Sequence, residues 1–529
     1  MSRVKTRGQS RWVLGAGLAL GLSPQAQALS FDFGDSGEWT LDWDTIVSYS
    51  AMWRVEKQDR DKFAFRDTGD LLGDLTRYTL MANSTDGNYN FGREMVQNRI
   101  SVVTEVDINR DDFGVFARAR AYYDEAYDGR TSHRQQDYLS YNSADIYGGD
   151  AAFQEFPGGT VDEHRDRLEM LDYFIYSGGE LGERLYQLRL GSQVINWGEA
   201  TFYQGINGLQ NRADAIAATT PGVEVKEILL PTGALYGQVD LTDALSFEAY
   251  YQYEWKETEL NGVGSYLSDR DFLGPGASSF LVALSPELFL VAPLEEIADA
   301  SDSGQWGAAL HWFTDGGTDI GFYYVNAHNK APAYQLHYEG LIPSSYSVLY
   351  FEDIEGIAAS FTTVVGGANV QGEVSWKEGM PVVLANGDPV AGDVWAVQVG
   401  GSTVLEPTAL WDDFNLTFEF AGTGIDSHSN RELRYDDAAL AVALRAELAY
   451  LNVMPGVDLR LIPFLQHTLD GTVLEAQMAE KATTFNLTLK GVYLNNLSAQ
   501  VGYTAYFDGG DDNLISDRDN VTFNISYSF

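Results

Sequence analysis

Apolar and polar residues alternate along most of this chain from about residue 39 onward. The last nine residues, 521–529, alternate without exception and end on an aromatic side chain. Residues 245–256 repeat the pattern, with Leu245 and Phe247 on one face and Ser246 and Glu248 on the other. A period of two residues over such lengths indicates β-strands with one apolar and one polar face.

Short and long connections take turns between these strands. Tight turns are predicted at 109–112, 315–317, 366–367, 454–456 and 495–496, and much longer links separate the resulting hairpins. Outer-membrane β-barrels join strands of about 9 to 11 residues by short periplasmic turns and long outer loops. We therefore predict an all-β transmembrane barrel of about 18 antiparallel strands, within a range of about 14 to 18. The alternation is weakest in the strands near 394–404 and 414–422.

The two faces of the strands carry different chemistry. The apolar rows end in tryptophans that fit the aromatic girdles of a membrane barrel, namely Trp39, Trp43, Trp53, Trp255 and Trp376. The opposite rows hold charged residues, which a water-filled lumen accepts more easily than a packed core does. These predicted lumen charges are Arg118, Arg120, Arg189, Glu248, Glu254, Glu373, Arg445, Glu447 and Arg460. They either pair across strands in water or form a selecting constriction.

The first 28 residues have the composition of a secretory signal peptide. Four basic residues precede a short apolar stretch at 12–22, and Ala26-Gln27-Ala28 fits a cleavage site. We predict a signal peptide at 1–28 and a single barrel domain at 29–529. The net charge of −42 would repel a phosphate backbone, so no nucleic-acid partner is expected, and without cysteine there is no thiolate chemistry.

The link at 198–231 is predicted to fold into the barrel. Residues 208–218 have helical character, and Pro221-Gly222 would end the helix. Glycines allow the chain to turn sharply inward, and barrels of this size otherwise enclose an open channel. We call this segment the hatch. Inside a lumen, Glu199 and Asp214 would need basic partners, for which Arg189 and Arg212 are candidates.

The link at 259–302 is unusually apolar for an outer loop. Its apolar residues include Phe272, Leu273, Phe280, Leu288 and Phe289. Such a loop should not lie open in water. It either packs against itself over the rim, folds inward over the mouth of the barrel, or contacts an apolar ligand.

Signals for other chemistry are sparse. The seven histidines are scattered and have no metal-ligand spacing, so neither an enzyme nor a metal or other cofactor is predicted. The acidic run 508–513 is either a solvated outer loop or a calcium site. The terminal Phe529 is expected to act as the signal that directs the chain to the barrel-assembly machinery.

One segment also resembles a known family. Residues 188–260 are similar to the proteobacterial outer-membrane family called domain of unknown function 1302 (DUF1302), whose two chain ends are matched as well. The motif residues are Gly191, Gln193, Trp197, Gly198, Glu199, Gly205, Asn207, Asp214, Pro221, Gly222, Leu230 and Pro231. The resemblance implies an outer-membrane barrel that works with a periplasmic or lipoprotein partner and an inner-membrane transporter of the resistance-nodulation-division type. It also implies passage of hydrophobic, fatty-acid-like or sterol-like compounds.

Three functions are compatible with this sequence. The first is a conduit for hydrophobic or amphipathic small molecules, with an apolar vestibule under 259–302 and the hatch as a plug. The second is a water-filled porin in which the lumen charges select polar solutes. The third is an enzyme or adhesin on a barrel scaffold.

Overall fold

The structure is a computed structural model, and it describes residues 29–34, 38–59, 62, 67–132, 154–285, 288–429, 431–474 and 477–529. The expected signal peptide, 1–28, lies outside the described residues. Within the described ranges, no helix is long and apolar enough to span a membrane.

Eighteen antiparallel strands form one closed barrel. The last strand pairs with the first, from Ile46 opposite Ser528 to Arg54 opposite Asn520, so no edge is left in the wall. The predicted strand number is confirmed, including the two strands with weak alternation. The strands are β2 Trp39–Arg54, β3 Met95–Arg110, β4 Phe113–Asp124, β5 Asp166–Leu181, β6 Arg184–Gln193, β9 Thr232–Thr242, β10 Leu245–Gln252, β13 Gln305–Phe313, β14 Asp319–Ala327, β17 Ile354–Val365, β18 Ala368–Val383, β19 Pro389–Leu405, β20 Asp413–Ser427, β21 Ala438–Met454, β22 Val457–Asp470, β23 Thr483–Tyr493, β24 Leu497–Phe507 and β25 Asn520–Ser528.

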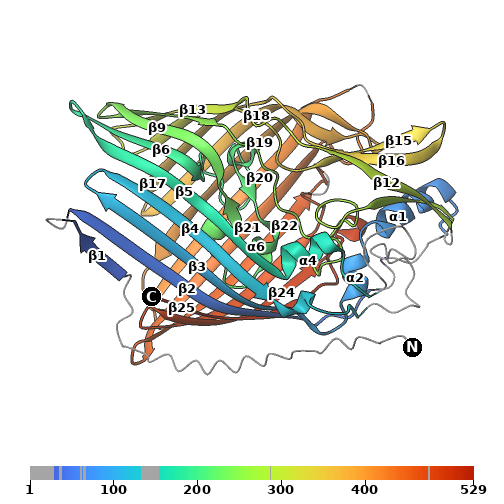
Figure 1. Ribbon diagram of the computed structural model, residues 1–529, viewed down its shortest axis with the longest axis horizontal. Coiled ribbons are helices and arrows are strands. Elements are labelled where there is room, and N and C mark those ends of the chain that lie inside the picture. The colour runs from blue at the N-terminus through green and yellow to red at the C-terminus, as the bar shows by residue number, and fades with distance from the viewer. Residues whose placement is uncertain are drawn as a thin grey trace, which may run out of the picture.

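The two ends of the barrel differ. The C-terminus and the added strand β1 (Leu29–Phe33), which pairs with the first residues of β2, lie at the left end in Figure 1. The short turns are at this same end, which is the periplasmic end of an outer-membrane barrel. The long loops and most of the short helices lie at the other end, which we call the outer end.

The alternation separates a lipid face from a lumen face. On β21, Leu440 and Leu444 point outward with 51% and 40% of their surface exposed, whereas Ala441 and Ala443 between them are buried inside. The prediction that Trp255 belongs to the aromatic girdle is wrong. Strand β10 ends at Gln252, so Trp255 is buried among the outer loops, with its ring 4.7 Å from that of Tyr350.

A second sheet of four strands stands at the outer end. It contains β11 Ser279–Ser285, β12 Leu288–Ala298, β16 Ile342–Leu349 and β15 Ala333–Glu339, in that order. Helix α1 (Leu71–Ala82) packs against β11, and Figure 1 shows this group projecting beyond the barrel. We call the four strands with α1 the outer lobe. The remaining helices of the outer end are α2 Asp86–Asn90, η2 Glu125–Tyr127, α4 Gly158–His164 and η3 Gly510–Asp512.

Candidate functional site: the hatch and the lumen

The hatch crosses the interior of the barrel. It holds the short elements α5 Asn207–Gln210, β7 Arg212–Ala213, α6 Ala215–Thr219, α7 Val225–Ile228 and β8 Leu229–Leu230. The single helix expected at 208–218 is wrong, because Arg212 and Ala213 pair with Leu230 and Leu229 as strands and separate α5 from α6. The inward fold itself is confirmed, since wall residues of β2, β3, β4, β18 and β20 all bind hatch atoms.

Strand β18 holds the beginning of the hatch. The Glu373 carboxylate accepts hydrogen bonds from the backbone N–H of Glu199 at 2.9 Å and of Ile206 at 2.6 Å. Lys377 Nζ donates to the carbonyl of Gly205 at 2.7 Å. A Cβ at Gly198 or Gly205 would lie 2.1 Å from a Glu373 carboxylate oxygen, and Gly198 has a φ of +85°. These two glycines therefore allow the backbone to reach the carboxylate.

Strand β20 supplies a second carboxylate. Glu419 is only 1% exposed, and it accepts the backbone N–H groups of Thr201, Phe202 and Tyr203 in succession. The ring of Tyr203 is buried against a row of alanines on β20 and β21, and the ring of Phe202 lies 5.6 Å from that of Phe464. Charge-assisted bonds and apolar contacts thus hold the same three hatch residues.

The opposite side of the hatch is held by the arginines of β4. Arg120 Nη2 lies 2.5 Å from Asp214 Oδ2, and Arg120 Nε donates to Glu169 at 2.8 Å. Arg118 pairs with Glu105 and Asp172 and also donates to the carbonyl of Lys226 at 3.1 Å. Asp214 in addition caps α6, because its Oδ1 accepts the N–H of Ala217 at 2.8 Å.

The basic partners expected for the hatch carboxylates are therefore wrong. Asp214 pairs with Arg120, while Arg212 pairs with Glu259 at 3.2 Å. Arg189 faces β9 and lies over the ring of Tyr236, 4.3 Å from its centroid. The physical reason is position. Asp214 lies beside β4, whereas Arg189 is on β6, the strand from which the hatch begins.

The start of the hatch faces an acidic part of the lumen. Trp197 Nε1 donates to Glu248 at 2.8 Å, and Tyr236 OH donates to the same carboxylate at 2.9 Å. In the described part of the chain no arginine forms an ion pair with Glu199. Burial and the neighbouring Asp319 and Glu373 carboxylates raise the pKa of Glu199. Asn207 has a local role, since its Oδ1 accepts the N–H of Gly205 at 3.0 Å.

Lysine 330 also holds the hatch, from the loop that follows β14. Its Nζ is buried and donates to the carbonyls of Leu209 at 2.9 Å and His328 at 3.3 Å, and to Gln305 Oε1 at 3.2 Å. Burial lowers the pKa of Lys330 to about 7. Sequence reasoning missed Lys330, Lys377 and Glu419, because each binds backbone atoms of a segment far away in the chain.

Residues 220–222 of the hatch lie against the strands that close the barrel. Ser50 Oγ donates to the Pro221 carbonyl at 3.0 Å, and a Cβ at Gly222, where φ is +82°, would meet the side chain of Asn524 at 2.4 Å. Arg99 Nη1 and Gln97 Nε2 both bind Thr220 Oγ1. The Pro-Gly pair thus brings the backbone against the wall.

The wall beyond the hatch is more open and polar. Its inward side chains on β23, β24 and β25 are half-buried, namely Asn486, Thr488, Lys490, Gln500, Thr504 and Thr522. Glu447 binds both Arg445, at 2.9 Å, and Arg460, at 2.8 Å. The prediction of Glu254 as a lumen charge is wrong. Glu254 lies past the end of β10, where it accepts the N–H of Gly233 at 3.0 Å and pairs with Lys256.

The apolar residues of 259–302 belong to the outer lobe. Phe272, Leu273 and Phe280 are buried in one cluster with Tyr334 and Tyr346. Of the remaining two, Leu288 is 56% exposed at the tip of β12, and Phe289 packs against Tyr78 of α1 with ring centroids 5.5 Å apart. Most of this link thus packs within the outer lobe, against β15 and β16 of the link between β14 and β17 and against α1.

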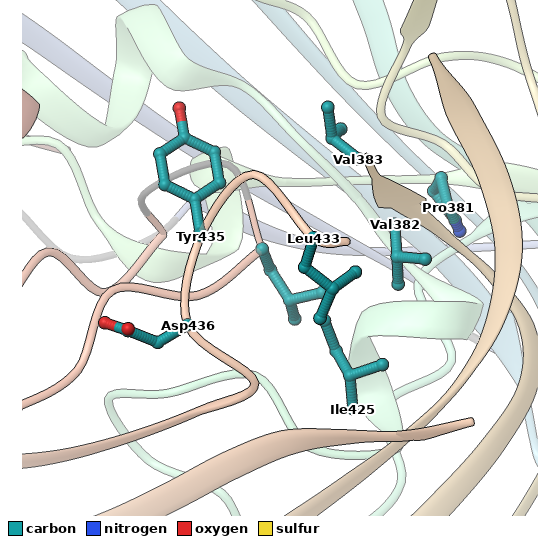
Figure 2. Close-up of a pocket in the computed structure, with 8 residues that line it drawn as sticks. Pro381, Val382, Val383, Ile425, Leu433, Tyr435 and Asp436 are labelled. Atoms are coloured by element: carbon teal, nitrogen blue, oxygen red, sulfur yellow. The ribbon is translucent and has the colours of Figure 1, made fainter. Parts of the chain in front are cut away.

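A small apolar pocket lies at the outer rim, beside the hatch. Val382, Ile425, Leu433 and Leu474 are among its lining residues, and Figure 2 shows Val382, Leu433 and Ile425 converging on it while Tyr435 and Asp436 lie to one side. Its cavity volume is about 10 Å³, which is room for about one water molecule. Ile425 and Leu474 also pack against the cluster that contains Tyr203.

Two further predicted features lie at the ends of strands. Phe529 exchanges backbone hydrogen bonds with Thr45, at 2.8 and 3.0 Å, and its role in assembly stays a prediction. In the acidic run 508–513, Asp511 binds Arg77 of α1 at 2.7 Å, so this loop is tied to the outer lobe.

The chain is matched by the model of the family described as protein of unknown function (DUF1302), over residues 10–529. No curated protein matches it. Among solved structures, Acinetobacter baumannii OccAB4 is similar over 92% of this chain and 98% of its own, with 10% identity and a TM-score of 0.44. Pseudomonas aeruginosa OccK5 (OpdH) covers 92% and 98%, with 9% identity and a TM-score of 0.42. Salmonella typhi OmpF in complex with daunomycin covers 95% and 100%, with 9% identity and a TM-score of 0.37.

Proposed function

The chain belongs to the DUF1302 family, and from that premise we propose that it is an outer-membrane channel for hydrophobic or amphipathic small molecules, fatty-acid-like or sterol-like in character. The hatch is the gate of this channel. We further propose that an inner-membrane transporter of the resistance-nodulation-division type and a periplasmic or lipoprotein partner work with it, as the family resemblance implies.

One observation carries the proposal: apolar side chains connect the outer rim to the hatch. The rim pocket shares Ile425 and Leu474 with the cluster around Tyr203, and that cluster continues to Phe202 and Phe464 inside the lumen. An apolar molecule could move along this surface while it stays partly shielded from water, at roughly 25 cal/mol for each Å² removed from water.

Passage requires the hatch to move. Phe202 and Tyr203 are the hatch residues on the apolar surface, and the Glu419 bonds to their backbone hold both rings in place. A ligand that binds better when these rings are displaced would shift the population toward an open lumen. The hatch strands form a small sheet of their own and do not pair with the barrel strands, so such a shift leaves the barrel itself intact.

A second function has its own support. The half-buried polar wall of β23 to β25, with Lys490 and the Arg445–Glu447–Arg460 group, would suit a water-filled porin for polar solutes. The two functions use different walls of the same lumen, so they can be tested separately.

The test compares two single substitutions, one on the apolar surface and one on the polar wall of the lumen. Ile425→Asp places a charge on the apolar surface, and Thr488→Asp places the same charge on the polar wall. We expect Ile425→Asp to lower uptake of an apolar fluorophore, N-phenylnaphthylamine, by about tenfold in cells with matched expression, because the charge must be desolvated on that path. Swelling of proteoliposomes in a small sugar should be unchanged.

The reverse result favours the porin. If Thr488→Asp changes sugar permeation while Ile425→Asp leaves uptake of the fluorophore unchanged, the apolar path is wrong. Heat-modifiable migration of both variants shows that each barrel is folded before transport is measured.

A further inference from the structure

The outer wall of the barrel contains an apolar groove that faces the membrane. Residues of six neighbouring strands, from β10 to β19, line it, and its volume is about 590 Å³. Its outward direction follows from exposure: Phe322 and Ile357, two of its lining residues, are 49% and 55% exposed on the lipid face. The groove is therefore separate from the lumen and from the hatch.

Strand register explains the shape of the groove. Two rows of side chains cross the strands, and each row has an alanine among large residues. Ala308 stands opposite Tyr324, and Ala359 stands opposite Phe322. Since neighbouring strands lie about 4.8 Å apart, a groove across six strands is about 24 Å long. The two alanines form its low points, and aromatic rings form its sides.

The groove has a defined depth in the membrane. Trp376 and Trp395, which are register partners, lie in the row nearer the outer end. One outward position farther along, Glu355 and Glu378 stand opposite each other. Aromatic residues followed by carboxylates mark the boundary between hydrocarbon and headgroups. The groove thus begins at the outer boundary and runs into the hydrocarbon.

We propose that this groove binds one hydrocarbon chain of an outer-leaflet lipid as a specific, slowly exchanging ligand. No charged side chain lines it, and it is continuous with the lipid-facing wall. Strands tilted by about 35 to 45° incline the groove, so its length covers about 15 Å along the membrane normal, which is about the depth of one leaflet. A hydrocarbon chain that fills the groove gains contacts on three sides instead of one.

The experiment is native mass spectrometry of the full chain, extracted from membranes in mild detergent and exchanged into a single defined phospholipid. We expect an adduct of one phospholipid per chain that survives activation which removes all other lipid. Ala359→Trp fills the groove and should reduce this adduct by about tenfold or more, because the indole ring occupies the space in which the hydrocarbon chain makes its dispersion contacts. Ala308→Phe fills the other low point and should act in the same direction.

Ala446→Trp is the matched control, since Ala446 occupies a lipid-facing position on β21 outside the groove. It should leave the adduct unchanged. Equal adducts in wild type and both groove variants would overturn the proposal, as would equal loss in Ala446→Trp. A wild-type adduct with the mass of a second copy of the protein, or of a host-derived compound that has no hydrocarbon chain, would overturn it too, whereas a retained host lipid would support it. Transport of N-phenylnaphthylamine is read separately, so failure here is distinguishable from failure of the proposed channel.

Discussion

The hatch and the outer lobe are both long connections of the same barrel, yet the hatch is held by contacts with the wall and the outer lobe by contacts within itself. Apolar hatch residues such as Ile206 and Leu209 also pack against the wall. Wall side chains bind the hatch through its backbone: Glu373 and Glu419 accept its N–H groups, and Lys377 donates to a carbonyl. The outer lobe is held by packing of its own aromatic residues, such as Phe272 and Tyr346. One segment depends on its surroundings, and the other carries its own core.

This difference has a consequence for movement. The bonds to the hatch backbone come from buried charged side chains, so each contributes about 1.5 to 3 kcal/mol, but each can break separately. Buried aromatic residues lose their contacts together when a core opens. The hatch is therefore suited to release in steps, whereas the outer lobe unfolds locally as a unit.

Removal of part of the hatch should have the largest effect. Deletion of residues 205–222 leaves an aqueous channel, because a barrel of this strand number is wide enough to be open. We expect inhibitory concentrations of bulky antibiotics to fall about tenfold or more at matched expression. Removal of the lobe tip, residues 339–342, is the control and should change none of them. Unchanged sensitivity after the hatch deletion would contradict the role of gate.

The Arg120 anchor should account for most of the stability on the β4 side. Arg120→Ala leaves Asp214 buried without its basic partner, while Glu169 keeps Arg167, so we expect the free energy of unfolding in denaturant to fall by about 3 to 5 kcal/mol. Arg460→Ala is the comparison, since Arg460 is 45% exposed and its pair with Glu447 should contribute about 1 kcal/mol or less. Equal losses in the two variants would show that the hatch bond is solvated like an ordinary surface pair.

A cavity in the outer lobe should act locally. Phe272→Ala removes a buried ring, at a cost of about 3 kcal/mol to the folded lobe. Limited proteolysis should then cut the 259–302 segment faster, while antibiotic sensitivity and heat-modifiable migration of the barrel stay as in wild type. A change in permeability would mean that the outer lobe and the hatch are coupled.

The smallest effect should be a pH dependence of the local stability of the outer loops. Burial raises the pKa of Asp271 to about 7, despite the backbone N–H groups of Thr85 and Asp86 and the nearby Arg518. The folded state therefore binds the Asp271 proton more tightly than the unfolded state does. The stability that results is complete below the ordinary Asp pKa of about 4 and is lost as the pH rises through about 7.

Hydrogen exchange of the Thr85 and Asp86 amides, corrected for the intrinsic rate, should therefore be faster at pH 8 than at pH 6. Asp271→Asn should remove this difference, and Asp243→Asn, at an exposed turn, should keep it. A difference that persists in Asp271→Asn would assign the pH dependence to another group.

The wall of the barrel follows from local sequence pattern. Each strand carries its own period of two, so the number of strands and the inward direction of Arg118, Arg120, Glu373 and Arg445 follow from local pattern. The long link with its glycines was enough to predict an inward hatch. Local signals suffice here because the lipid and the lumen impose opposite polarity on alternate residues of every strand.

The wall residues that hold the hatch cannot be identified without the three-dimensional arrangement of the strands. Asp214 meets Arg120, and Glu419 and Lys330 bind backbone atoms, which have no sequence signature. The end of β10 also depends on its neighbouring strand. Alternation continues to Lys256, but the partner strand β13 begins at Gln305, opposite Gln252, so the ladder of hydrogen bonds stops there. Glu254 and Trp255 consequently leave the wall. A strand extends only as far as its neighbours offer hydrogen bonds, and a period of two carries no information about those neighbours.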